Sequence, residues 1–452
     1  MIENKKNKGV ISLLFENLCQ KKIPYTILRN YETLPEKPLE GSDVDLLIAK
    51  DSEEKYSSAL KEAIFKSGGF ILLKIRQSNC LSCFVYQKTP FPFGTWIDAF
   101  WELSTKSFIW ADSNFLLQNR CQHQKGFFIL PPGGEAATLF VKEVLSGPFI
   151  KERYRLKIPG FVNADKENFI KTLESSFDKK IIQKMVQICL EGKWDEASKK
   201  RKSWWNHLVV NRFLRRPFSQ SFRFFDFVFS QFKKMIFQKE GGLMVAVLGP
   251  DGVGKTTICE GLKKRINDFP FKREKQYHGH FGFFPELGEM YSLIRGKKIL
   301  EQDKAAIQEK PIGFLRAILH LFYYGLEFFL SWPLVFWLKI RGNLIIFDRY
   351  FYDFIATKTH REIPFWMFSV IARIIPRPDI IFTIEAKPET ICGRKKDLSL
   401  KEIERQLEAF RDPRIAKISP VILINGEKTP DLILNDIEEE IMKNLAKKYG
   451  GK

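Results

Sequence analysis

The spacing of hydrophobic and polar positions changes along the chain and predicts different elements in its two halves. From Leu243 onward, short and nearly continuous apolar runs are separated by helical sequence. Runs of this kind are typical of parallel strands that helices cover on both faces. We therefore predict a doubly wound α/β domain over residues 241–452, with strands at 243–248, 275–278, 343–347, 379–384 and 421–425.

The first half alternates helical and strand patterns and predicts an α+β domain over residues 1–160. A strand is expected at 25–30, where the sequence reads YTILRN. Residues 161–198 have apolar positions three and four apart, which indicates helices. We therefore expect a helical connector over 161–240 between the two domains.

The second part of this connector, residues 199–240, is basic and aromatic. It holds eleven Lys and Arg against two acidic residues, and also two Trp and nine Phe. The whole chain has 452 residues and a formal charge of +20, so +9 of that charge lies in this segment. Such a segment suits the surface of a membrane. Alternatively, its apolar side packs on a domain while its cations stay in solvent, which is the commoner fate of amphipathic helices.

Cysteine usage and the N-terminal sequence favour a cytoplasmic protein. Seven cysteines at irregular spacing do not form a disulfide framework. The N-terminus is too charged for a signal peptide. The most apolar stretch, 312–338, is expected to be a buried or interfacial helix, because polar residues or proline interrupt it at Arg316, His320, Glu327 and Pro333.

A zinc site is one interpretation of Cys80, Cys83, Cys121 and His123, because three cysteines and a histidine are a known ligand set. The sequence around Cys80 and Cys83, SNCLSCFVY, favours a strand instead. On a strand, residues three apart point to opposite faces and do not share a metal.

The strand at 243–248 is followed directly by a phosphate-binding loop, GPDGVGKTT, before a predicted helix. Glycines let backbone N–H groups close around phosphates, and the helix N-terminus adds positive charge. We expect Lys255 to reach the β- and γ-phosphates of ATP and Thr256 to bind Mg²⁺. The ATP-binding residues are expected to be Gly249, Asp251, Gly252, Val253, Gly254, Lys255, Thr256 and Thr257.

The third predicted strand of this domain runs into Asp348 and Arg349. A carboxylate at the end of a strand beside the phosphate loop can order Mg²⁺ or accept a proton from the acceptor. The guanidinium of Arg349 would offer a planar fork to an acceptor phosphate.

The order of these motifs resembles the thymidylate kinase family over residues 241–452. The resemblance implies a five-stranded P-loop kinase with a mobile lid, in which Arg394, Lys395 and Lys396 stabilise the transferring phosphoryl group. On the acceptor side, His278-Gly279-His280 stands where the family has a Glu-Pro-Gly stretch. This departure puts dTMP in doubt as the acceptor. With it, the domain resembles the thymidylate-kinase-like proteins of bacterial envelope-glycan gene clusters.

Two carboxylates in the first domain, Asp43 and Asp45, alternate with apolar residues and would share one side of a strand. Asp98 is a candidate third ligand for divalent metal. The pattern resembles the polymerase-β-type nucleotidyltransferase superfamily over residues 1–160. That family has a Gly-Ser turn upstream, where this chain has Leu28-Arg29-Asn30; Arg29 substitutes as the phosphate contact, or the site is inactive.

The leading hypothesis is an ATP- and Mg²⁺-dependent kinase of a small acceptor, joined to a nucleotidyltransferase-like domain and serving envelope or nucleotide-sugar metabolism. The alternative is a nucleotide-binding scaffold that docks on the inner face of the membrane through residues 199–240. Nucleic acid is not expected as a partner, because no DNA- or RNA-binding motif accompanies the charge. A homo-oligomer stays open.

Overall fold

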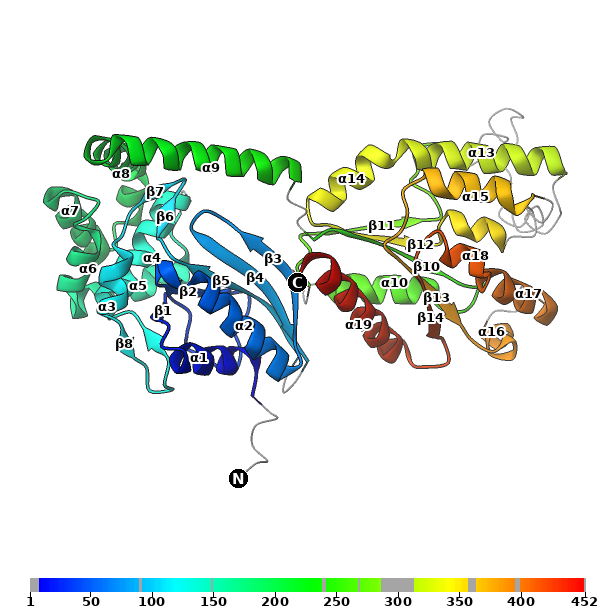
Figure 1. Cartoon of the computed structure of the whole chain (residues 1–452), viewed down its shortest axis with the longest axis horizontal. Helices are drawn as coiled ribbons and strands as arrows, with labels where there is room; N and C mark the ends of the chain where they lie inside the picture. Colours follow the sequence, from blue (N-terminus) through cyan, green and yellow to red (C-terminus); the bar gives the residue numbers. More distant parts are fainter. Residues whose placement is uncertain are drawn as a thin grey trace, which may run out of the picture. The chain divides into compact units, whose positions relative to one another are not determined.

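The chain divides into two compact units, which are described here separately (Figure 1). The first unit comprises Met1–Gln238 with Tyr449–Lys452, and the second comprises Lys239–Lys448. The computed structural model describes residues 8–88, 92–147, 149–237, 241–266, 269–285, 313–356, 363–394 and 399–450.

The first unit is built on a mixed sheet of seven strands in the order β3-β4-β5-β2-β1-β9-β8. Strand β2 runs parallel to β5 and β1 parallel to β9, while the other neighbours are antiparallel. The strands are β1 (Tyr25–Ile27), β2 (Val44–Ile48), β3 (Phe70–Arg76), β4 (Cys80–Gln87), β5 (Phe93–Phe100), β8 (Cys121–Gln122) and β9 (Phe128–Ile129). A separate hairpin pairs β6 (Ser104–Thr105) with β7 (Phe108–Ile109).

Helices cover both faces of this sheet. Along β2, Leu46 and Ile48 belong to one apolar core and Leu47 to the other, because successive side chains of a strand point to opposite faces. Helices α1 (Val10–Gln20) and α2 (Glu53–Ser67) cover one face. The other core contains residues of α3 (Ser113–Gln118), α4 (Pro132–Ser146), α5 (Glu152–Ala164), α6 (Lys166–Leu173), α7 (Lys179–Glu191) and α8 (Trp194–Arg215).

The helices expected to form a separate connector belong to this unit. The proposed boundary at residue 160 falls inside α5, and Phe169, Met185 and Trp204 share a core with Phe140 of α4. The rings of Phe140 and Trp204 lie 6.0 Å apart. The apolar faces of α6, α7 and α8 therefore complete the second core of the unit.

Helix α9 (Pro217–Phe237) is the last helix of the first unit and has two different faces. On the inner face, Arg223 forms an ion pair with Glu102 at 2.5 Å and the ring of Phe224 lies 6.5 Å from that of Phe108. On the other face, four phenylalanines are exposed: Phe218, Phe222, Phe225 and Phe229. The segment 199–230 thus packs through one side, as its amphipathic pattern predicts, and leaves an apolar stripe on the other.

The second unit contains a parallel sheet of five strands in the order β11-β12-β10-β13-β14. All five predicted strands are confirmed to within one residue at either end. They are β10 (Leu243–Leu248), β11 (Glu274–His278), β12 (Leu344–Asp348), β13 (Ile380–Glu385) and β14 (Val421–Asn425).

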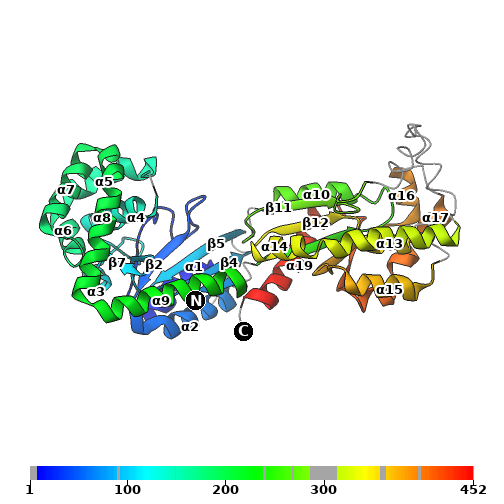
Figure 2. The ribbon, with the colours of Figure 1, turned by 90° about the horizontal axis from the view of Figure 1, so that it is seen from above.

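Helices lie on both sides of the parallel sheet, as Figures 1 and 2 show. Helices α13 (Phe314–Leu330), α14 (Trp332–Ile340) and α15 (Phe365–Ile374) cover one side, and α10 (Lys255–Lys264) and α19 (Pro430–Tyr449) lie on the opposite side. Helices α16 (Pro388–Arg394), α17 (Leu400–Phe410) and α18 (Pro413–Ala416) follow β13. In such sheets ligands bind at the carboxyl ends of the strands, and the loop after β10 lies at that end.

The apolar stretch of the sequence forms α13 and α14. Taken together, Phe314–Ile340 are 27 residues with a mean hydropathy of 1.3, enough by length and composition alone to cross a membrane. However, Leu321 and Phe328 of α13 are buried against the sheet, where Phe328 contacts the rings of Phe347 and Tyr350. The helix therefore covers the sheet with one face, as expected for a buried or interfacial helix.

Candidate active site

The phosphate loop connects β10 to α10 in the second unit. Gly249 has φ 146° and approaches the next strand so closely that an added Cβ would lie 2.6 Å from the carbonyl oxygen of Ile384. Gly252 and Gly254 also have positive φ, at 89° and 103°. Side chains rarely adopt these conformations, so the glycines are needed for the loop to close.

Lys255 begins α10, and its side chain is curled back into the loop. Its ammonium donates to the carbonyl oxygens of Gly249 at 2.8 Å and Pro250 at 2.9 Å, and to Asp251 at 3.2 Å. Burial lowers the pKa of Lys255, and the nearby Arg349 guanidinium lowers it further. A phosphate would offset both effects, because an anion close to a buried amine favours its charged form.

Asp348 ends β12 directly beside α10. Its Oδ2 accepts the Thr256 hydroxyl at 2.6 Å, and Oδ1 is buried without a hydrogen-bond partner in the described part of the chain. Buried carboxylate oxygens are rarely left unpaired, and Mg²⁺ prefers hydroxyl and carboxylate oxygens. The oxygens of Thr256 and Asp348 therefore fit the Mg²⁺ site that the sequence predicts.

Arg349 stands between two carboxylates. Its guanidinium donates to Asp353 at 3.0 Å and forms an ion pair with Asp251 of the phosphate loop. Burial lowers the pKa of Arg349, but Asp353 and Asp251 outweigh that effect and hold it above the ordinary value. The backbone of Arg349 has φ 70°, a conformation that is uncommon outside glycine and often found at functional sites.

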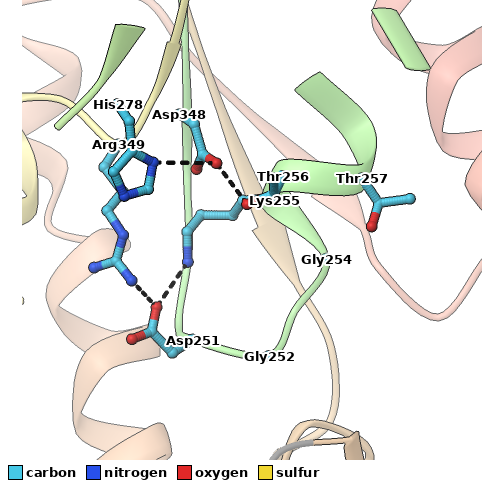
Figure 3. Close-up of a pocket in the computed structure, with 9 residues that line it drawn as sticks. All are labelled: Asp251, Gly252, Gly254, Lys255, Thr256, Thr257, His278, Asp348 and Arg349. Atoms are coloured by element: carbon cyan, nitrogen blue, oxygen red, sulfur yellow. Dashed lines mark hydrogen bonds and ion pairs between the residues drawn. The ribbon is translucent and has the colours of Figure 1, made fainter. Parts of the chain in front are cut away.

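These groups surround a cavity of about 270 Å³ (Figure 3). Figure 3 shows Lys255 and Arg349 both pointing at Asp251, while Asp348 lies between Thr256 and His278. The cavity is lined by Asp251, Gly252, Gly254, Lys255, Thr256, Thr257, His278, Asp348 and Arg349. All of these residues except His278 were expected in the site from the sequence.

His278, at the end of β11, was not singled out as a site residue. Its Nδ1 lies 3.5 Å from Asp348 Oδ2, and its side chain is 71% exposed. Strands β11 and β12 are parallel, with His278 paired in register with Asp348. The signal in the sequence was that both residues end predicted strands of one parallel sheet, whose carboxyl ends share an edge.

The predicted lid residues are only partly described. Arg394 ends α16, where its guanidinium donates to the carbonyl oxygens of Val253 at 3.5 Å and Gly426 at 3.4 Å. Arg394 is thus adjacent to the phosphate loop. Lys395 and Lys396 lie outside the described residues.

A buried carboxylate orders the loop after β11. Glu327 on α13 is 0% exposed, and its Oε1 accepts the backbone N–H of Phe283 at 2.9 Å and lies 3.2 Å from His280 Nδ1. Tyr323, one turn earlier, donates to the carbonyl oxygen of Pro285 at 2.9 Å. The sequence predicted Glu327 only as an interruption of an apolar stretch, whereas the structure shows that it fixes the segment after β11 that contains His280 and Phe283.

The carboxylates of the first unit gather at β2 and β5. Asp45 and Asp98 are register partners on these neighbouring parallel strands, and Asp43 comes just before β2. Burial, and then the charge of Asp45, raises the pKa of Asp98 to about 7; the same causes raise the pKa of Asp43. The negative charges therefore lie close enough to disfavour one another.

A cationic side chain already balances one of these aspartates. Arg29 donates to Asp45 at 2.7 Å, with both side chains nearly buried. In the described part of the chain, no group of three His, Cys, Asp or Glu side chains is arranged to hold a metal ion. Arg29 thus pairs with one of the three aspartates of the predicted metal site, which stays a prediction from the sequence.

The four residues of the zinc alternative do not come together. Cys80 and Cys83 are buried on β4, while Cys121 is exposed on β8. In the strand order, four strands separate β4 from β8, which is a distance of about 24 Å at roughly 4.8 Å per strand. The strand interpretation of SNCLSCFVY is therefore confirmed, and strand packing explains the burial of its cysteines.

Comparison with known proteins gives similarity to thymidylate kinases. No family model matches the chain. The chain is 24% identical over 209 residues to "Probable thymidylate kinase 1" of Saccharolobus solfataricus, across 45% of this chain and 98% of that protein. It is 22% identical over 214 residues to "Probable thymidylate kinase" of Staphylothermus marinus, across 46% of this chain and 98% of that protein.

Two solved thymidylate kinases are also similar. The enzyme of Ehrlichia chaffeensis aligns with 14% identity and a TM-score of 0.32, over 44% of this chain and 99% of its own. The enzyme of Candida albicans aligns with 16% identity and a TM-score of 0.32, over 45% of this chain and 93% of its own. The sequence comparisons thus show a thymidylate kinase-like, P-loop kinase similarity over about 45% of the chain.

Proposed function

We propose that the second unit transfers the γ-phosphoryl group of ATP to a nucleotide or a related small acceptor. The observation that supports this most directly is the pairing of a phosphate loop with Asp348, which accepts the Thr256 hydroxyl at 2.6 Å. The similarity to proteins named thymidylate kinase agrees with this reaction class. The cytoplasmic setting expected from the sequence would supply the ATP.

The side chains of the site have separate tasks in this reaction. The loop N–H groups and the N-terminus of α10 hold the phosphates, and Lys255 leaves its loop carbonyls to bind them. Bound Mg²⁺, held by Thr256 and Asp348, would neutralise charge on the phosphates. Arg394, with Lys395, would stabilise charge on the transferring group, so catalysis is mostly positioning and electrostatics.

The acceptor is the less determined half of the reaction. The Arg349 guanidinium pairs with both Asp251 and Asp353. Arg349 can therefore bind an acceptor phosphate only if that phosphate displaces Asp251. His278 and the segment held by Glu327 stand where an acceptor would lie. We propose dTMP as the first acceptor to assay because the similar proteins are named thymidylate kinase. Other nucleotides and the sugar intermediates of envelope glycans follow, because His278-Gly279-His280 departs from the Glu-Pro-Gly stretch of that family.

Transfer of label from [γ-³²P]ATP tests the proposal. Asp348→Ala should abolish transfer and keep ATP binding, while Lys255→Ala should weaken ATP binding as well. Lys264→Ala is the matched control, because Lys264 is an exposed lysine on the same helix. Full transfer by the Asp348→Ala variant would refute the assignment.

A second candidate function, a nucleotide-binding scaffold at the membrane, is favoured by the exposed stripe on α9. Phe218 is 91% exposed and Phe222 76% exposed, which is unusual for phenylalanine. In that case ATP would order the second unit, and residues 199–240 would dock on a membrane. Flotation with anionic vesicles, using the chain with and without the substitutions Phe222→Gln, Phe225→Gln and Phe229→Gln, tests this role.

Nucleotidyl transfer by the first unit stays a prediction from the sequence. The raised pKa of Asp98 favours a site of concentrated negative charge, but Arg29 rather than a metal balances Asp45. Titration with Mn²⁺ tests the prediction directly. Binding by the wild-type chain that Asp98→Asn abolishes would support it, and no binding would leave the first unit without this activity.

A further inference from the structure

The outer face of the second unit is unusually apolar over α13, α14 and α15. Thirteen large hydrophobic side chains on these helices are exposed: Phe314, Leu315, Leu319, Phe322, Leu326, Phe329, Leu330, Trp332, Phe336, Trp337, Trp366, Val370 and Ile374. We call this set the outer apolar face. At about half exposure each, these side chains present on the order of 1,000 Å². A typical monomer exposes at most about 300–600 Å² in one patch.

The three helices are neighbours, so their exposed residues form one surface region. An added Cβ on Gly325 of α13 would lie 2.8 Å from Ile371 of α15, which shows how closely the two helices pack. The Trp332 indole of α14 donates to the carbonyl oxygen of Ile374 at the end of α15 at 2.8 Å. Figure 1 shows α13, α14 and α15 on the same side of the sheet.

The exposed positions repeat with helical spacing. On α13, Leu315, Leu319, Phe322 and Leu326 are 52–73% exposed, while Leu321 and Phe328 are buried. The helix is therefore apolar on both sides, with one side on the sheet and the other in solvent. A helix with apolar residues on its outer face needs a second apolar surface or a membrane to cover it.

In residues 313–341 and 363–378, which contain α13, α14 and α15, the exposed charges have one sign. Exposed arginines stand on or beside these helices at Arg316, Arg341, Arg373 and Arg377. Glu327 is the only acidic residue in 313–341 and 363–378, and it is fully buried. The Arg341 guanidinium lies 4.0 Å above the Trp337 ring, so the cation sits directly at the edge of the apolar side chains.

The positive charge of these arginines discriminates between a second copy of the chain and a membrane as the surface that covers the outer apolar face. In a twofold dimer the same patch meets itself, so the arginines of one copy would approach those of the other without exposed acids to pair with. An anionic bilayer instead offers acyl chains to the leucines and phenylalanines and lipid phosphates to the arginines. Three tryptophans in the face add side chains that favour the membrane interface.

We propose that the outer apolar face binds the surface of an anionic membrane. The bound helices lie in the plane of the interface rather than crossing it, because their inner faces cover the parallel sheet. Since Tyr323 and Glu327 of α13 hold the loop after β11, binding also brings the proposed acceptor side of the kinase to the membrane surface. Membrane binding does not require phosphoryl transfer, so the two proposals can fail independently.

Vesicle flotation of the full chain tests this proposal. Vesicles contain either phosphatidylcholine alone or an equal mixture of phosphatidylcholine and phosphatidylglycerol. The test variant carries Leu319→Gln, Phe322→Gln and Leu326→Gln, since glutamine keeps a good helix propensity. The matched control replaces three exposed apolar residues on helices outside both apolar surfaces, by Phe65→Gln, Leu156→Gln and Leu432→Gln. Circular dichroism and binding of a fluorescent ATP analogue establish that each variant is folded.

The expected result is that the wild-type chain and the control variant bind the anionic vesicles, and that the α13 variant binds at least tenfold less. Binding should be weaker to phosphatidylcholine alone and should fall as salt is raised, because salt screens the arginines. No flotation of the wild-type chain, or equal flotation of the two variants, would overturn the proposal. A chain that sediments as a dimer, and that the α13 substitutions convert to a monomer without vesicle binding, would assign the face to a second copy.

Discussion

Replacing Asp98 by asparagine should stabilise the first unit, and the gain should grow as the pH rises. Burial and the charge of Asp45 raise the pKa of Asp98 from 3.8 to about 7. Well below the unfolded pKa of 3.8, the carboxyl group is neutral in both the folded and the unfolded chain, so its contribution to stability is fully present. As the pH rises, the unfolded chain ionises first, and this stability is lost until the folded pKa near 7 has been passed.

The size of the effect follows from the shift. A difference of about 3 pKa units corresponds to at most about 4 kcal/mol, at roughly 1.4 kcal/mol per unit. Partial access of water to the side chain reduces this, so we expect about 2–4 kcal/mol. Asparagine has nearly the same shape and does not ionise. The stability difference between Asp98→Asn and wild type should therefore increase by about 2–3 kcal/mol between about pH 4.5 and about pH 8, because the unfolded carboxyl group is already mostly ionised at pH 4.5.

Urea unfolding of the full chain at both pH values measures this difference. The two units are expected to unfold in separate transitions, and the transition of the second unit is the one that ATP shifts. Glu135, whose pKa is also raised to about 7, is present in both proteins and cancels in the comparison. A stability difference that does not change with pH would show that Asp98 is not held in a charge-disfavouring environment.

Three further predictions concern the second unit. Gly249→Ala should abolish binding of a fluorescent ATP analogue, because its Cβ would meet a backbone carbonyl at 2.6 Å, whereas Gly393→Ala, where nothing lies within 4 Å, should bind normally. Thr256→Val removes the 2.6 Å hydrogen bond to Asp348 and should lower kcat at least tenfold in the transfer assay, while Thr256→Ser should keep most activity. Glu327→Leu leaves the Phe283 N–H without its acceptor and should destabilise the second unit by about 1–3 kcal/mol in urea unfolding.

The sequence predicts the second unit well because its signals are local. Each strand is a short apolar run, and the glycines and Lys255 follow the first strand without a gap. Parallel strands bring their carboxyl ends to one edge, so the meeting of Thr256 with Asp348 follows from the order of the elements. Local pattern and global fold agree here, as expected for a strongly specified domain.

What the sequence did not predict depends on contacts between distant residues. The pairing of Arg349 with Asp251 joins residues 98 positions apart and depends on the positive φ of Arg349. In the first unit, the sequence offered Arg29 as a phosphate contact or else an inactive site, and in the structure Arg29, just after β1, pairs with Asp45 of β2. The spacing of residues in a sequence does not show which carboxylate a guanidinium pairs with, because the pairing depends on where three-dimensional packing buries both groups.

The positive charge of the chain has two structural uses that composition alone does not separate. In the segment 199–237, Arg212 donates to Ser176 at 2.7 Å and Arg223 pairs with Glu102 at 2.5 Å, so these cations fasten α8 and α9 to the first unit. Around α13–α15, by contrast, the exposed arginines have no exposed acid among the described residues of those helices. A high local density of Lys and Arg therefore shows where the cations of the first unit lie in the sequence. Exposed arginines without neighbouring exposed acids are the better indication of an anionic partner. By that criterion the membrane surface belongs with the outer apolar face, where the arginines accompany leucine, phenylalanine and tryptophan side chains that water disfavours.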